Sequence, residues 1–240
     1  MNDLHPFADP PAGTHPPLDT PAYRSTATRH PTQPLVRLPP ELADPTDLTG
    51  PVFGLGDVTA ADADLTIGPD GEAVGQRIIV TGRLLDGAGR PIRRSLVEIW
   101  QANASGRYRH RGDQWPGALD PNFTGGGRVL TDDDGTYRFT TIKPGAYPWG
   151  NHPNAWRPAH IHVSVFGWAF TQRLVTQMYF PDDPLFFQDP ILSAVPEPAR
   201  PRLVARYDHD VSVPEWALGF RWDIVVRGPA ATPFEAPAGG

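Results

Sequence analysis

Proline and glycine interrupt this chain so often that long helices are excluded. The 240 residues include 30 prolines and 24 glycines. Inside a helix, proline removes a backbone donor and clashes with the preceding turn, whereas both residues favour the tight turns between strands. Many short apolar runs lie between these breaks. The pattern predicts a mainly β protein, an antiparallel β-sandwich with long loops.

Alternating side chains identify the individual strands. In the run 95–101, Leu96 and Trp100 fall on one face of an extended chain, and Val97 and Ile99 fall on the other. Other segments show comparable patterns between turn signals. The expected strands are 77–86, 95–101, 128–131, 136–142, 160–165, 173–180 and 220–226, with short helical turns near 190–195 and 198–206.

The Pro-rich segment 1–49 is predicted to be an extended N-terminal arm, followed by the β-sandwich domain at 50–240. The arm has two interpretations. It is either a floppy tail or a segment that packs on its own domain or on a partner, because Phe7, Tyr23 and Leu38 give it apolar surface to bury. The sequence leaves both interpretations open.

Composition narrows the function classes. The formal net charge is −6 and no basic stripe is present, so nucleic acid binding is not expected. The absence of cysteine removes disulfides and thiolate metal sites and suits a cytoplasmic location. Residues 1–21 lack the pattern of a secretory signal, and no apolar run approaches the ~18 residues of a membrane helix, so no membrane association is expected.

The run 147–162 contains a tyrosine, an arginine and a His-x-His pair. In a strand, His160 and His162 point to the same side, which makes them candidate metal ligands. Neutral imidazole suits zinc, copper, iron and nickel alike. The ordinary alternative is a pair of histidines on a solvated strand face that binds no metal. The identity of a third ligand would distinguish between the possible metals.

Three ligand sets are compatible with this pair. His152 would complete a three-histidine zinc site. A two-histidine, one-carboxylate iron site lacks its usual pairing here, because His162 stands where the carboxylate is expected. The phenolates of Tyr108 or Tyr147 would favour a hard cation such as ferric iron. Each tyrosine could instead be structural, so the residues alone leave the choice open.

Five runs together resemble the intradiol ring-cleaving dioxygenases, a likeness that extends from about Tyr23 to Gly228. The resemblance implies a β-sandwich enzyme that uses O2 to open a catechol-type ring between its two hydroxyl-bearing carbons. The likeness is greatest to members that convert protocatechuate (3,4-dihydroxybenzoate) to 3-carboxy-cis,cis-muconate, in aromatic catabolism by the β-ketoadipate pathway. The runs are 96–103 (LVEIWQAN), 106–110 (GRYRH), 120–123 (DPNF), 141–149 (TIKPGAYPW) and 156–162 (WRPAHIH).

The resemblance also implies a cofactor, mononuclear non-haem Fe(III). Its ligands would be Tyr108, Tyr147, His160 and His162, with a solvent-derived hydroxide. Tyr147 is expected to leave the metal and accept a proton as the catechol binds. His152 would then be an ordinary loop histidine.

Further site residues follow from the same resemblance. Arg157 would stabilise negative charge on the deprotonated substrate, and Gln177 would help to orient it. The residues implied to line the pocket are Trp100, Trp149 and Ile191. Tyr23 is implied to contact the substrate carboxylate.

The resemblance implies a related alpha chain as partner, in a higher-order hetero-oligomer. A close alternative is an intradiol dioxygenase for catechol or hydroxyquinol, although those relatives carry a helical dimerisation segment where this chain has its Pro-rich arm. An alternative from another class is a non-catalytic, transthyretin-like binding module, supported by the strand and turn pattern of 82–147. Such a module would have no need of Tyr108, Arg157, His160 and His162 together.

Overall fold

Two β-sheets dominate the computed structural model, which describes residues 13–16, 57–150, 155–166 and 173–235. The first sheet is antiparallel, in the order β10 (Arg173–Tyr179), β9 (His160–Phe166), β4 (Leu96–Trp100), β5 (Gly126–Leu130). The second contains β11 (Arg206–Tyr207), β12 (Leu218–Arg221), β3 (Arg77–Leu85), β13 (Ile224–Val225) and β6 (Thr136–Ile142).

One hydrophobic core joins the two sheets. Side chains from both sheets belong to the same buried cluster, which confirms the prediction of a mainly β sandwich. The alternation predicted for 95–101 is also confirmed, because Val97 and Ile99 enter the core while Trp100 does not. The central members are Ile78, Val80, Leu84 and Phe139 from the second sheet, and Ile99, Ile161, Val163 and Met178 from the first.

The pairing at β3 departs from the sequence prediction. The single strand expected at 220–226 is divided into β12 and β13, and both pair in parallel with β3 rather than antiparallel. Trp222 N still donates to Thr81 O (2.9 Å), but the carboxylate of Asp223 accepts the next bond from Arg83 N (2.8 Å). A side chain therefore replaces a backbone acceptor at the break, which alternation along the sequence does not signal.

Short elements complete the described part of the chain. The helical turns predicted near 190–195 and 198–206 are confirmed as α3 and η4, while the β7–β8 ribbon was not predicted. The short elements are η2 (Ala60–Ala63), β1 (Ile67–Gly68), β2 (Gly71–Glu72), β7 (Tyr147–Trp149), β8 (Ala155–Arg157), η3 (Phe186–Gln188), α3 (Pro190–Ala194) and η4 (Glu197–Leu203). Over these same residues, no helix combines the length and apolar character needed to span a membrane.

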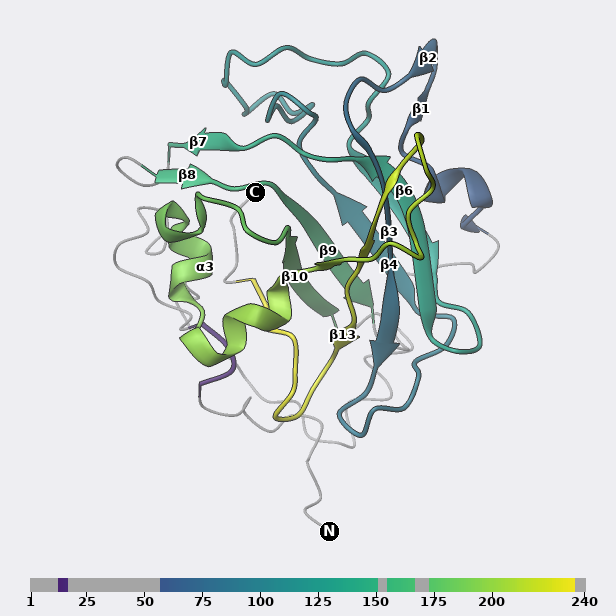
Figure 1. Cartoon of the computed structure of the whole chain (residues 1–240), viewed down its shortest axis with the longest axis vertical. Helices are drawn as coiled ribbons and strands as arrows, with labels where there is room; N and C mark the ends of the chain where they lie inside the picture. The colour runs from purple at the N-terminus through teal and green to yellow at the C-terminus, as the bar shows by residue number, and fades with distance from the viewer. Residues whose placement is uncertain (1–12, 17–56, 151–154, 167–172, 236–240) are drawn as a thin grey trace, which may run out of the picture.

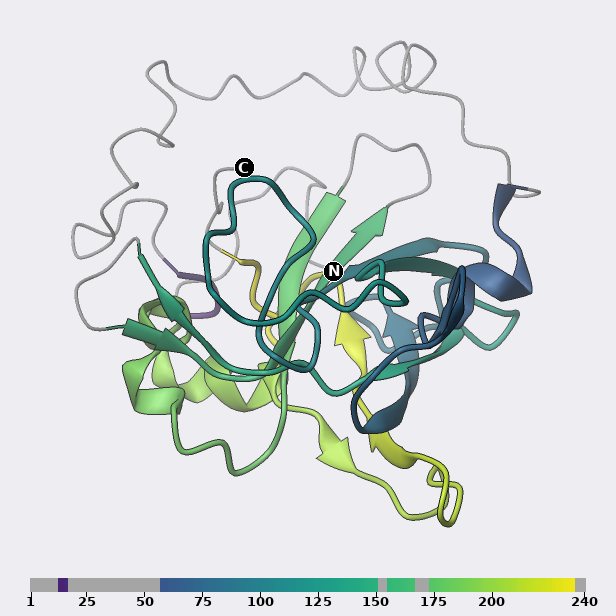
Figure 2. The same cartoon turned by 90° about the horizontal axis from the view of Figure 1, so that it is seen from above.

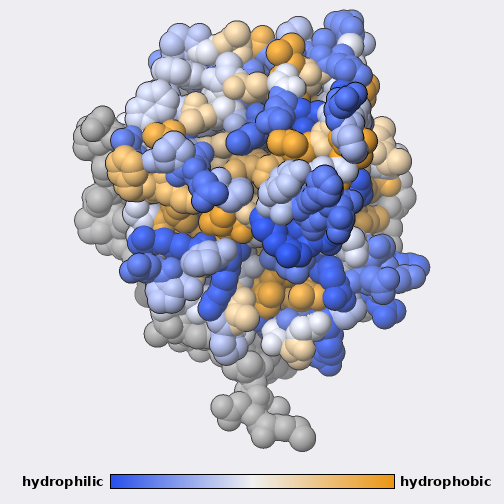
Figure 3. All heavy atoms as spheres, viewed as in Figure 1, coloured by the Kyte–Doolittle hydropathy of each residue, from blue (hydrophilic) through white to orange (hydrophobic). Residues whose placement is uncertain are grey.

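Short elements gather on one side of the molecule. The β7–β8 ribbon and α3 lie on the same side in both views (Figures 1 and 2). The face seen in Figure 3 mixes hydrophilic with hydrophobic residues. The ribbon carries Tyr147 and Arg157, so this side of the sandwich positions the candidate site.

Candidate metal centre

Strand register gathers one set of polar side chains on the face of β9 and β10 that points away from the core. Across the two strands, His162 is opposite Gln177 and His160 is opposite Tyr179. On the other side of β9, Trp100 of β4 is opposite His162. Because directly opposed residues of an antiparallel pair project to the same face, these five side chains share one surface.

Two glycines bring the tyrosines to this surface. Gly106 has φ +76°, and a Cβ atom there would lie 2.4 Å from Ala146 O. A Cβ atom on Gly145 would lie 2.4 Å from Ala104 O, and Gly145 N donates to Asn103 O (2.9 Å). Only glycine permits this approach of the two backbones. The loop that carries Tyr108 is thereby held against the start of β7, which carries Tyr147.

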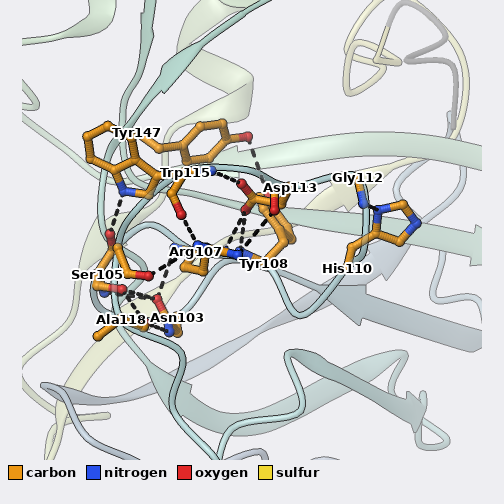
Figure 4. A network of polar contacts seen from close by, with 11 residues as sticks. Asn103, Ser105, Arg107, Tyr108, His110, Gly112, Asp113, Trp115, Ala118 and Tyr147 are labelled. Atoms are coloured by element: carbon orange, nitrogen blue, oxygen red, sulfur yellow. Dashed lines mark hydrogen bonds and ion pairs between the residues drawn. The ribbon is translucent and has the colours of Figure 1, made fainter.

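Hydrogen bonds fix the shape of the Tyr108 loop (Figure 4). Asn103 Oδ1 accepts from Ser105 N (3.0 Å) and Arg107 N (2.9 Å). The Asp113 carboxylate accepts from Tyr108 N (2.7 Å), while the Arg107 guanidinium donates to backbone carbonyls of the same loop, including Trp115 O. Arg107 thus stabilises the loop that carries Tyr108.

The four predicted ligands are brought together. Tyr147 Oη lies 3.4 Å from His160 Nε2 and 3.5 Å from Tyr108 Oη, and Tyr108 Oη lies 3.1 Å from His162 Nε2. The imidazole centroids of His160 and His162 are 4.9 Å apart. Two phenol oxygens and two imidazole nitrogens therefore converge on one small region.

Each imidazole is oriented by its second nitrogen. His160 Nδ1 is 2.7 Å from the Pro158 carbonyl oxygen, and His162 Nδ1 is 3.0 Å from Glu235 Oε2. A carbonyl and a carboxylate only accept, so both Nδ1 atoms carry a proton, and in the neutral imidazole this leaves the lone pair on Nε2. This is the arrangement that a metal-binding histidine requires.

Burial disfavours charge on these ligands when no cation is present. It raises the pKa of Tyr108 well above the usual 10.0, and neighbouring Tyr147 raises it further. Burial likewise raises the pKa of Tyr147, although Arg157 opposes this. It lowers the pKa of His160 well below 6.5, and Arg157 adds to that effect. Ionised phenols therefore need a strong positive charge beside them.

The donor set fits a hard metal cation. Metal–donor bonds of about 2 Å place neighbouring donors roughly 3 Å apart, which is close to the separations described above. Within the described residues, no group of three or more histidine and carboxylate side chains could hold a metal without other donors. A metal at this place would consequently use the tyrosine oxygens.

A buried polar cluster stands beside the four donors. Arg157 Nη2 donates to Gln177 Oε1 and to Tyr179 Oη (3.3 Å), and Arg157 Nε forms an ion pair with Asp189 Oδ1 (3.0 Å). Tyr179 Oη also donates to Asp189 Oδ2 (2.9 Å). Burial opposes the charge on Arg157, but Asp189 raises its pKa well above the ordinary value. The guanidinium is therefore permanently charged.

The predicted pocket residues contact either a ligand candidate or a member of this cluster. Trp100 stacks on His162 with ring centroids 4.9 Å apart, and the Arg157 guanidinium lies 5.6 Å from the Trp149 ring centroid. Ile191 is buried in α3, where its N–H donates to Asp189. Tyr23 and His152 lie outside the described residues.

Three residues of the site were missed from the sequence. Tyr179 could have been found, because it follows Gln177 at the strand period on the same face. Asp189 had a local signal as the N-cap before Pro190. Glu235 lies 73 residues from His162, and nothing in its local sequence signals that contact.

Comparisons with known proteins all identify dioxygenases as relatives. A family model described as "Dioxygenase" matches residues 48–228, and one for the N terminus of the protocatechuate 3,4-dioxygenase beta subunit matches residues 7–41. The chain is 55% identical to the protocatechuate 3,4-dioxygenase beta chain of Burkholderia cepacia, over 92% of this chain and 94% of the other. It is 30% identical to the alpha chain of the same enzyme, over 68% and 78%.

The fold has matches among solved structures as well. The 3-chlorocatechol 1,2-dioxygenase of Rhodococcus opacus superposes with a TM-score of 0.53 at 24% identity, over 73% of this chain and 69% of the other. At that identity, the similarity concerns the fold.

Proposed function

The chain belongs to the intradiol dioxygenase family, and we propose that it opens the ring of protocatechuate between its two hydroxyl-bearing carbons to give 3-carboxy-cis,cis-muconate. Family membership makes the protein an oxidoreductase and implies non-haem iron. The observation that carries the proposal is the convergence of two tyrosine hydroxyls and two imidazole Nε2 atoms beside a buried guanidinium. Similarity to a protocatechuate 3,4-dioxygenase beta chain supports the choice of substrate.

The proposed cofactor is one ferric ion held by Tyr108, Tyr147, His160 and His162. Phenolate is a hard anionic donor and suits a highly charged cation, while neutral imidazole accepts iron among other metals. The bound ion would supply Lewis acidity, so that a chelated catecholate becomes able to react with O2.

Tyr147 is the proposed proton acceptor. It lies on the short β7–β8 ribbon, whereas the two histidines lie on β9, an inner strand of the four-stranded first sheet. Its Oη atom is 3.4–3.5 Å from its neighbours, a looser contact than the 3.1 Å between Tyr108 and His162. These features support a ligand that departs, taking a proton from the incoming catechol at its Oη atom.

Arg157 and Gln177 would act on the substrate. The guanidinium is held by Asp189 and Tyr179 and cannot lose its proton, so it can stabilise negative charge on the deprotonated catechol throughout the reaction. Gln177 presents its carbonyl to Arg157, which sets the orientation of both side chains. Trp100, Trp149 and Ile191 would exclude water, and Tyr23 would meet the substrate carboxylate.

A related alpha chain is the proposed partner, and it would complete the substrate pocket. The support is the similarity to both the beta and the alpha chains of one Burkholderia enzyme.

Oxygen uptake tests the substrate assignment. The iron-loaded chain, purified with its alpha partner, should consume O2 with protocatechuate and release 3-carboxy-cis,cis-muconate, identified by mass spectrometry. Catechol and hydroxyquinol should be much poorer substrates. Faster uptake with either would reassign the substrate within the family, and absence of uptake with all three would contradict the proposal.

A further inference from the structure

The C-terminal segment 228–235 is anchored to strands of both sheets. Thr176 Oγ1 donates to Pro233 O (2.7 Å), and Glu235 N donates to Val175 O (2.7 Å). Thr232 N donates to Val225 O of β13 (2.8 Å). The segment therefore has a fixed path over β10, and the path ends beside the metal-ligand candidates.

His15, from the N-terminal part of the chain, also holds this segment in place. The imidazole of His15 stacks on Phe234 with ring centroids 4.5 Å apart, and Phe234 N donates to His15 Nδ1 (3.1 Å). Phe234 immediately precedes Glu235, so this contact helps to place the carboxylate. Backbone and side-chain bonds together leave Glu235 little freedom to move away from the site.

Glu235 directs its carboxylate at His162 from inside the protein. Its side chain is 2% exposed, and Oε2 lies 3.0 Å from His162 Nδ1. Its other oxygen, Oε1, is buried as well, and the Gln177 side chain is a further hydrogen-bond partner of the carboxylate. Burying a carboxylate is costly unless charge compensates it. With a cation bound and both phenols ionised, the anionic side chains would outnumber Arg157, and the cation would balance the excess negative charge.

The two imidazoles are supported differently. His160 relies on the Pro158 carbonyl, two residues away in the chain, whereas His162 relies on a carboxylate 73 residues away. A carboxylate on Nδ1 makes the opposite nitrogen a more basic ligand than a carbonyl does. His162 should therefore be the stronger donor of the pair.

We propose that Glu235 is a positioning residue of the metal centre. It accepts the Nδ1 hydrogen of His162, fixes the direction of Nε2 toward the Tyr108 hydroxyl, and supplies negative charge that strengthens the bond from His162 to the metal. This inference rests on the proposed ferric site. It adds a residue of the C-terminal segment to the groups that determine how tightly the metal is held.

Two substitutions separate orientation from charge. Glu235→Gln keeps an acceptor for His162 Nδ1 but removes the charge, and Glu235→Leu removes both. Iron affinity, measured by competition with a chelator, should fall about 10- to 100-fold in Glu235→Leu and by less in Glu235→Gln. The visible tyrosinate-to-iron band should shift in both variants, since a weaker imidazole donor changes the charge on the iron.

Thr232→Val is the matched control. It removes the acceptor for Val225 N in the same segment without touching a ligand candidate. It should lower the stability of the fold while leaving the band position and the iron affinity unchanged. The full 240-residue chain is used throughout, with its alpha partner.

The outcomes distinguish this inference from the proposed function. A wild-type protein without iron or without the band would overturn the ferric site itself. A wild-type protein with both, whose Glu235 variants match it in band and iron affinity, would overturn only the role of Glu235. Equal effects from Thr232→Val, or iron-free Glu235 variants that are unfolded by circular dichroism, would reduce Glu235 to a stabilising residue and overturn the inference.

Discussion

Tyr147 and Arg157 are directly opposite each other in the β7–β8 ribbon. Their side chains therefore project to the same face, toward His160 and the Asp189 cluster. The proposed departing ligand and the proposed anion-stabilising charge are thus linked by one short hairpin. Movement of the ribbon would alter the metal contact and the substrate contact together.

Replacing either candidate tyrosine ligand should change the colour of the protein. Tyr108→Phe and Tyr147→Phe each remove one phenolate and leave the other, so the visible band should weaken and shift without disappearing. Absorption spectra at equal iron content provide the measurement. Tyr137→Phe is the control, because that hydroxyl bonds to Trp222 O away from the site. A band unchanged in both site variants would contradict the ligand assignment.

Asp189 should matter for both stability and turnover. Asp189→Ala leaves the Arg157 charge buried without its partner and removes the N-cap of α3, at a cost of about 3–5 kcal/mol of unfolding free energy. Asp189→Asn retains the cap and should cost less. Urea unfolding and steady-state oxygen uptake measure the two effects. Equal stability of Asp189→Ala and the wild type would show that the ion pair contributes nothing.

Gly106 should not tolerate a side chain. Gly106→Ala places a Cβ atom against Ala146 O at a positive φ, so the two tyrosine-bearing segments must separate. We expect loss of stability together with loss of iron. Gly89→Ala is a close control, since Gly89 has φ +78° with no atom within 4 Å of the added carbon. Thermal unfolding and iron content of the two variants are compared, and equal behaviour would refute the importance of the close contact.

The iron-free protein should lose stability as the pH falls. Burial lowers the pKa of His160 well below 6.5, so the folded state keeps this imidazole neutral where the unfolded chain binds a proton. The stabilisation is complete above about pH 6.5 and declines below it, by about 1.4 kcal/mol per pH unit for one proton. Urea midpoints between pH 7.5 and 5.5 test this. His160→Asn should flatten the profile, and a slope that persists in this variant would assign it to another group.

The regular strands could be predicted from the sequence because each presents one apolar face to a single core. Val97 and Ile99 show this, because both enter the core while Trp100 does not. The β7–β8 ribbon could not, because Pro148 argues against a strand and is tolerated only in a ribbon whose two strands are both edges. The parallel pairing of β12 with β3 depends on the return path of a long intervening segment.

The same contrast holds for the site. Tyr108, Tyr147, His160 and His162 stand in recognisable motifs, whereas the contact between Glu235 and His162 exists only in three dimensions. Because the chain belongs to the dioxygenase family, the alternative of a non-catalytic, transthyretin-like binding module is wrong. The arm at 1–49, the role of Tyr23, the absence of nucleic acid partners and the cytoplasmic location stay predictions.

The visible spectrum of aerobically purified, iron-replete protein tests the central claim most directly. Two tyrosinates on one ferric ion predict a broad visible charge-transfer band at one iron per chain, and anaerobic addition of protocatechuate should change that band as Tyr147 leaves the metal. A colourless protein that contains a full equivalent of iron would contradict this account.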